Sequence, residues 1–341
     1  MKRSRKIFWW VLGVVLVFFL VRIFFYQTVQ VTGFEMGSTL VPGDRVIVNK
    51  FRAGWRLPHT IIGLPGASAP YADWFRLPDY RLPAIKSLKR GELIAFNRPF
   101  GSDLPIDRKP ILISRIAGFP GDTVLVWDKQ VYINRVIVDP PALVRTEYRV
   151  VMGSGEIPPA FLRRYNVEMP RLIDDIGIYD LDLDSRAREA IDQVKGISTI
   201  RSTKQFAGDS SIDYYPPSNF FLWNRDQFGP LIVPRKGLTV EVSIQAVDLY
   251  REIIENHEGN QLEIDWRGVR INGRPVERYT FKKDYYFVLD DNRDNPNDSR
   301  IIGFIPADHI IGVVKRVACS HQGKHNYLKK FRIDRTLKRV R

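Results

Sequence analysis

One apolar run near the N-terminus constrains the possible fold of this chain more than any other feature. Residues 7–25 read IFWWVLGVVLVFFLVRIFF and carry a single charge, Arg22. At about 1.5 Å rise per residue, a helix of this length approaches the ~30 Å thickness of the hydrocarbon core of a bilayer. A helix buried in a protein core would show a polar stripe, and this run shows none before Arg22. We therefore predict one membrane-spanning helix over residues 7–25.

The charges that flank this run predict its orientation. Four basic residues lie within the first six positions, and after Arg22 no lysine or arginine follows until Arg45. The positive-inside rule then places residues 1–6 in the cytoplasm and the rest of the chain outside it. Residues 27–33 contain no small-x-small cleavage pattern, so we expect the helix to stay attached rather than to be removed as a signal peptide.

The net charge suggests which kinds of partner to consider. The chain has 341 residues and a formal net charge of +14, which favours either nucleic acid or the anionic surface of a bilayer. An exported location argues against nucleic acid as a partner. We expect the basic C-terminal tail, residues 321–341, to lie in solvent beside the membrane surface.

Cysteine usage and the absence of cofactor motifs narrow the chemistry. The single cysteine, Cys319, excludes an internal disulfide framework. Cys319, His321 and His325 lie close together in the sequence, but on a basic tail we interpret them as incidental rather than as a zinc site. The sequence contains no nucleotide-binding loop, metalloprotease motif or internal repeat. We therefore expect neither a metal nor a cofactor.

Most segments after residue 26 are typical of β-strands bounded by Gly, Pro and Asp turns. Residues 52–88 read as a long loop, either packed or touching the membrane through Trp55, Trp74 and Phe75. Apolar residues recur at helical spacing in residues 185–194 and 246–256, which predicts two helices. The predicted strands cover residues 45–48, 92–96, 123–126, 285–289 and 310–317, with a hairpin turn at Asn272-Gly273.

Three segments carry motifs of a known family. Residues 36–44 read MGSTLVPGD, residues 113–122 read ISRIAGFPGD, and residues 291–306 read DNRDNPNDSRIIGFIP. In the same order they resemble three motifs of bacterial type I signal peptidase, Ser-Met-x-Pro-Thr-Leu-x-x-Gly-Asp, Ile-Lys-Arg-Val-x-Gly-x-Pro-Gly-Asp and Asp-Asn-Arg-x-Asn-Ser-x-Asp-Ser-Arg-x-x-Gly-x-Val-Pro. The resemblance covers most of the chain outside residues 139–260, which look like the insertion of the long form of this family.

This resemblance implies an architecture, a location and an activity. The implied fold is mainly β, a signal peptidase I-like antiparallel β domain with an α/β insertion, preceded by one N-terminal transmembrane helix. The implied location is the bacterial inner membrane, and the family activity is removal of signal peptides from exported preproteins by a serine/lysine dyad. The expected parts are the cytoplasmic N-terminus 1–6, the transmembrane helix 7–25, the first part of the β domain 26–138, the insertion 139–260, the second part 261–320 and the basic tail 321–341.

Four positions depart from the family motifs, and all four correspond to residues that take part in the family's reaction. The resemblance places the nucleophilic serine at Glu35 and the general-base lysine at Ser114. The serine that donates to the oxyanion corresponds to Gly33, and the serine that orients the lysine corresponds to Pro296. Ser114 offers no neutral amine to take a proton. A carboxylate ~4 Å from a developing oxyanion opposes it by about 4 kcal/mol at an effective dielectric of ~20, or roughly three decades of rate.

Other positions keep the residues of the family motifs. Without the dyad these residues have no reaction to support, so we interpret them as an ion-pair and loop-bracing network. They are Met36, Asp291, Asn292, Arg293, Asp298 and Arg300.

The leading hypothesis is therefore a proteolytically silent homologue, a pseudopeptidase, that binds an extended peptide as an added strand at a sheet edge. Its partner would be an exported preprotein, an active signal peptidase copy or the translocation machinery. The alternative is an active serine endopeptidase that uses a substitute residue, either Ser38 or Ser114 with another base. A third alternative is an acid pair of Glu35 with Asp298.

Overall fold

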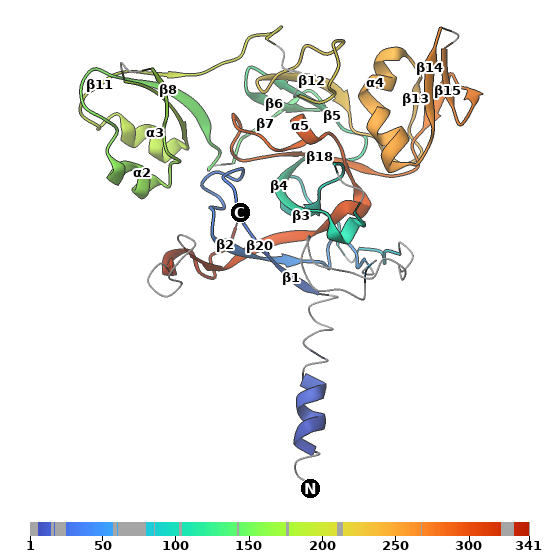
Figure 1. Cartoon of the computed structure of the whole chain (residues 1–341), viewed down its shortest axis with the longest axis horizontal. Helices are drawn as coiled ribbons and strands as arrows, with labels where there is room; N and C mark the ends of the chain where they lie inside the picture. The colour runs from blue at the N-terminus through green and yellow to red at the C-terminus, as the bar shows by residue number, and fades with distance from the viewer. Residues whose placement is uncertain are drawn as a thin grey trace. The chain divides into compact units, whose positions relative to one another are not determined.

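The computed structural model describes residues 6–14, 17, 25–56, 60, 80–84, 86–101, 104–141, 143–174, 177–209, 214–266, 268–321 and 331–340 (Figure 1). The chain divides into two compact units, which we describe separately. The first comprises Met1–Val31, Gly43–Leu112 and Asp308–Arg341, and the second comprises Thr32–Pro42 and Ile113–Ala307.

An antiparallel sheet forms the body of the first unit. Val46 and Val48 alternate with more exposed neighbours and are fully buried, which is the period of two that the sequence shows there. The strands predicted at residues 45–48, 92–96 and 310–317 are confirmed. Their order in the sheet is β1 (Tyr26–Gln30), β2 (Asp44–Asn49), β20 (Ile310–Ser320) and β3 (Leu93–Asn97), and the short helices η1 (Ile106–Arg108) and η4 (Ile333–Arg335) belong to the same unit.

The C-terminal residues 331–340 lie along β20. The Val317 amide donates to the Lys338 carbonyl at 3.0 Å, and the Val340 amide donates to the Lys315 carbonyl at 2.9 Å. The Arg335 guanidinium is buried and binds the buried Asp44 carboxylate, with Nη2 2.6 Å from Oδ2. This part of the predicted tail is therefore packed rather than solvated, while residues 322–330 and 341 lie outside the described residues.

The second unit is built around one large aromatic and aliphatic core. Its members include Phe228, Phe281, Phe287 and Phe304, each at most 2% exposed. The strands around this core, in order of pairing, are β4 (Ile111–Gly118), β18 (Tyr285–Leu289) and β19 (Ile305–Pro306); β12 (Gln227–Ile232), β5 (Thr123–Trp127), β6 (Gln130–Ile133) and β7 (Val136–Val138); β13 (Thr239–Glu241) and β17 (Arg278–Thr280); and β14 (Leu262–Asp265), β15 (Gly268–Ile271) and β16 (Arg274–Pro275). The helices are α4 (Ile244–Glu252), its π-helical continuation η2 (Ile253–His257) and α5 (Ser299–Ile302). The one-turn helix η3 (Ala307–His309) begins at the last residue of this unit.

Residues 146–202 of the second unit form an α/β lobe with a core of its own. The helices α2 (Pro159–Tyr165) and α3 (Ser185–Ile191) pack on the face of the sheet that carries Val150, Leu181 and Leu183. The Asp184 side chain caps α3 by accepting from the Ala187 amide at 2.9 Å. The lobe gives the insertion the expected α/β character, and its strand order is β11 (Ile197–Ser202), β8 (Thr146–Met152), β10 (Ile178–Leu183) and β9 (Arg171–Asp174).

The other sequence predictions agree with the described residues in most places. The mainly β fold is confirmed, as are the two helices, now α3 and α4 with η2. Asn272 and Gly273 adopt φ of 53° and 75° between β15 and β16, as a two-residue hairpin turn requires. Trp74 and Phe75 of the predicted loop 52–88 lie outside the described residues.

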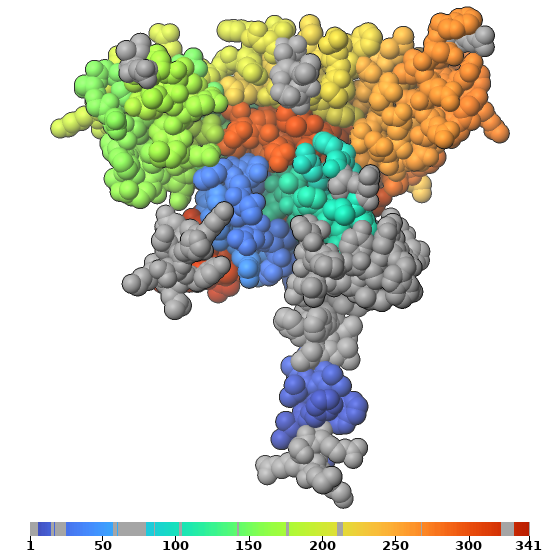
Figure 2. Space-filling model, viewed as in Figure 1, coloured from blue at the N-terminus to red at the C-terminus, as the bar shows by residue number. Residues whose placement is uncertain are grey.

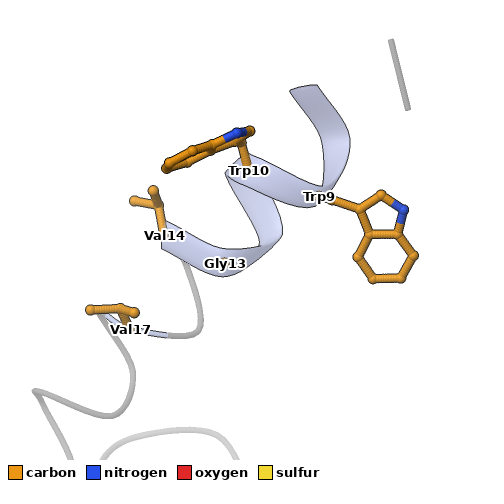
Figure 3. Close-up of a pocket in the computed structure, with 5 residues that line it drawn as sticks. All are labelled: Trp9, Trp10, Gly13, Val14 and Val17. Atoms are coloured by element: carbon orange, nitrogen blue, oxygen red, sulfur yellow. The ribbon is translucent and has the colours of Figure 1, made fainter. Parts of the chain in front are cut away.

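The N-terminal helix, residues 6–14, exposes apolar side chains around its whole circumference. Ile7 to Leu12 and Val14 are between 44% and 77% exposed (Figure 2). Trp9, Trp10, Val14 and Val17 border a shallow apolar hollow at Gly13 (Figure 3). Within the described part of the chain, no helix is both long enough and apolar enough to cross a bilayer. Residues 15, 16 and 18–24 of the predicted span lie outside that part.

The buried pair of Arg335 and Asp44 generates the first prediction. Arg335→Ala leaves the Asp44 carboxylate buried without its cation, so we expect the free energy of unfolding to fall by about 3–5 kcal/mol. The matched control is Arg339→Ala, at an exposed position of the same segment, which should change it by no more than about 0.5 kcal/mol. Urea titration of both variants measures the difference, and equal effects would contradict the structural role of the pair.

Candidate functional site

The three sequence motifs meet around one buried carboxylate, Asp291. Arg115 binds it with two parallel hydrogen bonds, Nε to Oδ1 at 2.8 Å and Nη2 to Oδ2 at 2.6 Å, and the Thr39 hydroxyl donates to Oδ2 at 2.5 Å. The register of β4 against β18 explains the meeting, because Arg115 pairs with Leu289 and the chain then turns inward to Asp291. Such charge-assisted, bidentate bonds fix both partners in position.

A second buried ion pair holds the end of the third motif. Asp298 caps α5 and binds Arg300 through Nη2 to Oδ2 at 2.8 Å, while the Asp290 amide donates to the same oxygen at 2.8 Å. Both side chains are at most 2% exposed. Burial, reinforced by the nearby Arg300 cation, lowers the pKa of Arg293 to about 10. The retained motif residues are therefore engaged with one another and with the backbone.

The Glu35 side chain takes up the space that a side chain at position 33 would need. The Glu35 carbonyl accepts from the Asn292 amide at 2.9 Å, which ties the first motif to the third. The Glu35 carboxylate folds back over Gly33, so that a Cβ added at position 33 would lie 2.5 Å from Glu35 Cδ and nearer still to both oxygens. A side chain at position 33 would therefore displace the Glu35 carboxylate, the flexible end of a half-buried side chain.

Ser114 is buried against a carboxyl group that the motif comparison did not single out. It is 1% exposed, and its hydroxyl hydrogen-bonds to Asp290, the residue before the third motif. Burial and the neighbouring Asp298 raise the pKa of Asp290 well above its ordinary value, and the hydrogen bond from Ser114 opposes this rise. A lysine at position 114 would meet the Asp290 carboxyl and would be held in its charged form.

The remaining predicted site residues are buried or packed and contribute to the structure around the site. Met36 is 2% exposed. Pro296 is half-buried in the loop between β18 and α5 and brings neither a hydroxyl nor an N–H group. The Asn292 side chain donates to Asp182 of the lobe at 3.0 Å. Among the described residues, which exclude His325, no group of three potential metal ligands occurs.

Ser38, the substitute nucleophile of the alternative hypothesis, is 5% exposed and has its hydroxyl engaged on both sides. Its Oγ accepts from Arg145 Nε at 3.0 Å, and it hydrogen-bonds to Asp184. Burial raises the pKa of Asp184, but the hydrogen bonds from Ser38, the Ala187 amide and Arg186 outweigh it, so the pKa is lowered. A carboxylate with a lowered pKa is a weak base. Asp298, the proposed partner of Glu35 in the acid-pair alternative, forms an ion pair with Arg300.

Sequence reasoning missed Asp290, Arg145, Asp182 and Asp184. Two signals pointed toward them. Gly37-Ser38 stands where the family motif has x-Pro, and Asp290 extends the acidic third motif by one residue. Neither signal identifies a partner, because Arg145 is 107 residues from Ser38, and Asp290 is far from Ser114 in the sequence.

The buried Asp290 carboxyl generates the second prediction, a pH dependence of stability. Its raised folded-state pKa means that stability is lost as pH rises from the unfolded value of about 3.9 through the folded value, and is regained on acidification. Asp290→Asn removes this titration. The gain in melting temperature of the variant over the wild type should therefore increase as pH rises from about 4.

Thermal melts followed by circular dichroism measure this difference. Asp192→Asn, at a carboxylate whose side chain is 54% exposed, is the matched control and should give a small difference that varies little over the same range. A gain for Asp290→Asn that grows on acidification would contradict the assignment.

Comparison with known proteins agrees with the motif geometry. The family model for signal peptidase, peptidase S26, matches residues 4–209 and 239–318. Signal peptidase I of Buchnera aphidicola subsp. Schizaphis graminum is 23% identical over 320 residues, which are 90% of this chain and 72% of that protein. Signal peptidase I of Pseudomonas aeruginosa is 31% identical over 176 residues, 49% of this chain and 52% of that protein. That of Pseudomonas fluorescens is 32% identical over 130 residues, 38% and 36% respectively.

The family match covers more than half of the chain and includes all three motifs that converge on Asp291. The chain therefore belongs to the signal peptidase family, peptidase S26.

Proposed function

We propose that this chain is a membrane-anchored pseudopeptidase, which binds an extended peptide and does not cleave it. One observation carries the proposal: both positions of the family dyad hold groups that are committed to other contacts. The Glu35 carboxylate fills the space over Gly33, and the Ser114 hydroxyl is bound to the buried Asp290. Neither position supplies a nucleophile paired with a free base.

The alternative, an active serine endopeptidase, finds less support in the same contacts. Ser38 lies between the Arg145 cation and a carboxylate of lowered pKa. Ser114 does have a carboxyl neighbour, Asp290, but this group is fully buried and also accepts from the Asn297 amide at 2.8 Å. No specific observation favours an active enzyme that uses Ser38 or Ser114 over an inactive protein.

A sheet edge supports the peptide-binding part of the proposal. Among the described strands, β1 pairs with β2 alone, so its other edge offers backbone groups to an added strand. The partners that this mode fits are an exported preprotein, an active copy of the peptidase or a component of the translocation machinery. We propose no nucleic acid, metal or cofactor.

The exposed apolar helix 6–14 supports membrane anchorage. Phe25, the last residue of the predicted span, contacts Phe51 and Trp55, and the three ring centroids lie 4.8–5.8 Å apart. Aromatic clusters of this kind favour the interface between lipid and water. We place the protein in the bacterial inner membrane, with the N-terminus in the cytoplasm. Exposed basic residues such as Lys338 and Arg339 add about 1 kcal/mol each near an anionic surface.

Reporter fusions test this topology. A periplasm-dependent reporter fused after Arg341 should be active, and a cytoplasm-dependent reporter at the same position should be silent, because the basic residues before the apolar run retain the N-terminus inside. The converse pattern would contradict the proposed orientation. Replacing the four basic residues at positions 2, 3, 5 and 6 with Gln should weaken the bias and serves as the matched control.

A cleavage assay on an exported preprotein tests the lack of activity. The purified full chain should leave the signal peptide attached, because in a catalytic triad enzyme the loss of one essential member already lowers kcat by roughly a millionfold. Wild-type cleavage that Ser38→Ala or Ser114→Ala abolishes would establish the active alternative instead.

Reversion extends the same test. We expect Glu35→Ser with Ser114→Lys, Gly33→Ser and Pro296→Ser to remain inactive while Asp290 is present, since its carboxyl would hold the new lysine in its charged form. Adding Asp290→Gly should allow weak turnover. Equal activity with and without Asp290→Gly would show that this carboxyl does not govern the base position.

A further inference from the structure

One residue of the insertion, Arg145, reaches the turn that carries Glu35. Its Nε donates to Ser38 Oγ at 3.0 Å, and its Nη2 donates to the carbonyls of Tyr165 at 3.2 Å and Asn166 at 2.6 Å, at the end of α2. The residue is 1% exposed. Arg145 therefore joins the 33–40 turn to the α/β lobe by one buried side chain.

The backbone of Arg145 is fixed to the third motif, so the side chain starts from a rigid point. Its amide donates to the Asp291 carbonyl at 2.7 Å, and its carbonyl accepts from the Arg293 amide at 3.0 Å. Figure 1 shows β8, whose first residue follows Arg145, beginning beside the blue turn. A second row of contacts runs alongside, from Asn292 to Asp182 and from the Glu147 amide to Asp294.

The first motif is adapted to receive this side chain. Gly37 has φ of +53°, and a Cβ there would lie 3.1 Å from Arg145 Cδ and 3.2 Å from Cγ. A side chain at position 37 would therefore press on the arginine. Ser38 supplies the hydroxyl that accepts from Nε, which the proline of the family motif has no means to do. The departure Gly37-Ser38 from x-Pro thus matches the presence of Arg145.

The contacts of Arg145 form at the cost of burying its positive charge. Among the described residues, none of the hydrogen bonds of Arg145 goes to a carboxylate, and its buried Nη1 has no acceptor. Burial lowers the pKa of Arg145, although Asp184, Asp182 and Glu168 oppose this through space. A buried cation without a contact ion pair carries a desolvation penalty that opening relieves. The contact can therefore open, unlike the doubly bonded pair of Arg115 and Asp291.

We propose that Arg145 is a positioning residue, a latch that holds the α/β lobe against the 33–40 turn and keeps Glu35 in its folded-back place. Displacement of the lobe by a partner releases the turn. The interpretation of this turn as the former nucleophile loop rests on the proposed function. The Arg145 contact is tested without any peptide, so a negative result there would leave the proposed function untouched.

Hydrogen exchange followed by mass spectrometry tests the latch in the full chain. Arg145→Met keeps the packing over Gly37 and removes the hydrogen bonds, so amides 36–40 should exchange at least about tenfold faster than in the wild type. The matched control is Arg149→Met, on the strand β8 that begins at the next residue, whose side chain is 48% exposed and bound to Asp180. That variant should leave exchange in the turn unchanged. Exchange in β14 and β15 should stay at the wild-type rate in both.

A second variant keeps the proposal falsifiable if Arg145→Met fails to fold. Ser38→Ala removes the acceptor of Arg145 Nε together with the hydrogen bond to Asp184 and should also raise exchange in the same amides. Combined with Arg145→Met, its effect should be less than the sum of the two single effects, because the two residues share one contact. Unchanged exchange in Ser38→Ala and Arg145→Met, or an equal rise in Arg149→Met, would overturn the latch and leave Arg145 as a space-filling side chain.

Discussion

The second unit depends on a single buried carboxylate that three distant stretches of sequence share. Asp291 receives Arg115 from one motif and Thr39 from another, and the residues on either side of it reach Ser114 and Glu35. Breaking such a centre leaves a charge buried without a partner, which is among the most costly changes a folded domain can suffer. This explains why the motif persists in a chain whose proposed role no longer includes the reaction.

The replacements around this centre form pairs rather than independent losses. Glu35 accompanies the glycine at position 33, because its carboxylate lies in the space that a side chain there would take. Ser114 accompanies the carboxyl of Asp290, and Ser38 accompanies Arg145. The pairs are not fully satisfied, because the buried atoms Arg145 Nη1 and Asp290 Oδ1 have no hydrogen-bond partner among the described residues. Under the proposed function, these contacts take the place of the dyad.

The sequence predicted the regular parts of this structure well and the new contacts poorly. Strands such as β2, β5 and β18 could be predicted because alternation and turn residues are local signals, and the motifs located Glu35 and Ser114 through fixed spacing. Arg145 could not be found in this way. It carries no periodic signal, and its partners lie at positions 38, 165 and 166. The packed state of residues 331–340 was missed for the same reason, since a basic segment looks solvated until Asp44 is known to lie beside it.

The pairing of Arg335 with Asp44 also sets an order of events during folding. The two residues are 291 positions apart, and the strand that receives the last segment, β20, pairs with β2, which begins at Asp44. A chain emerging N-terminus first therefore holds Asp44 without the Arg335 guanidinium while the residues between them are made. This ion pair can form only after every residue of the second unit has been synthesised.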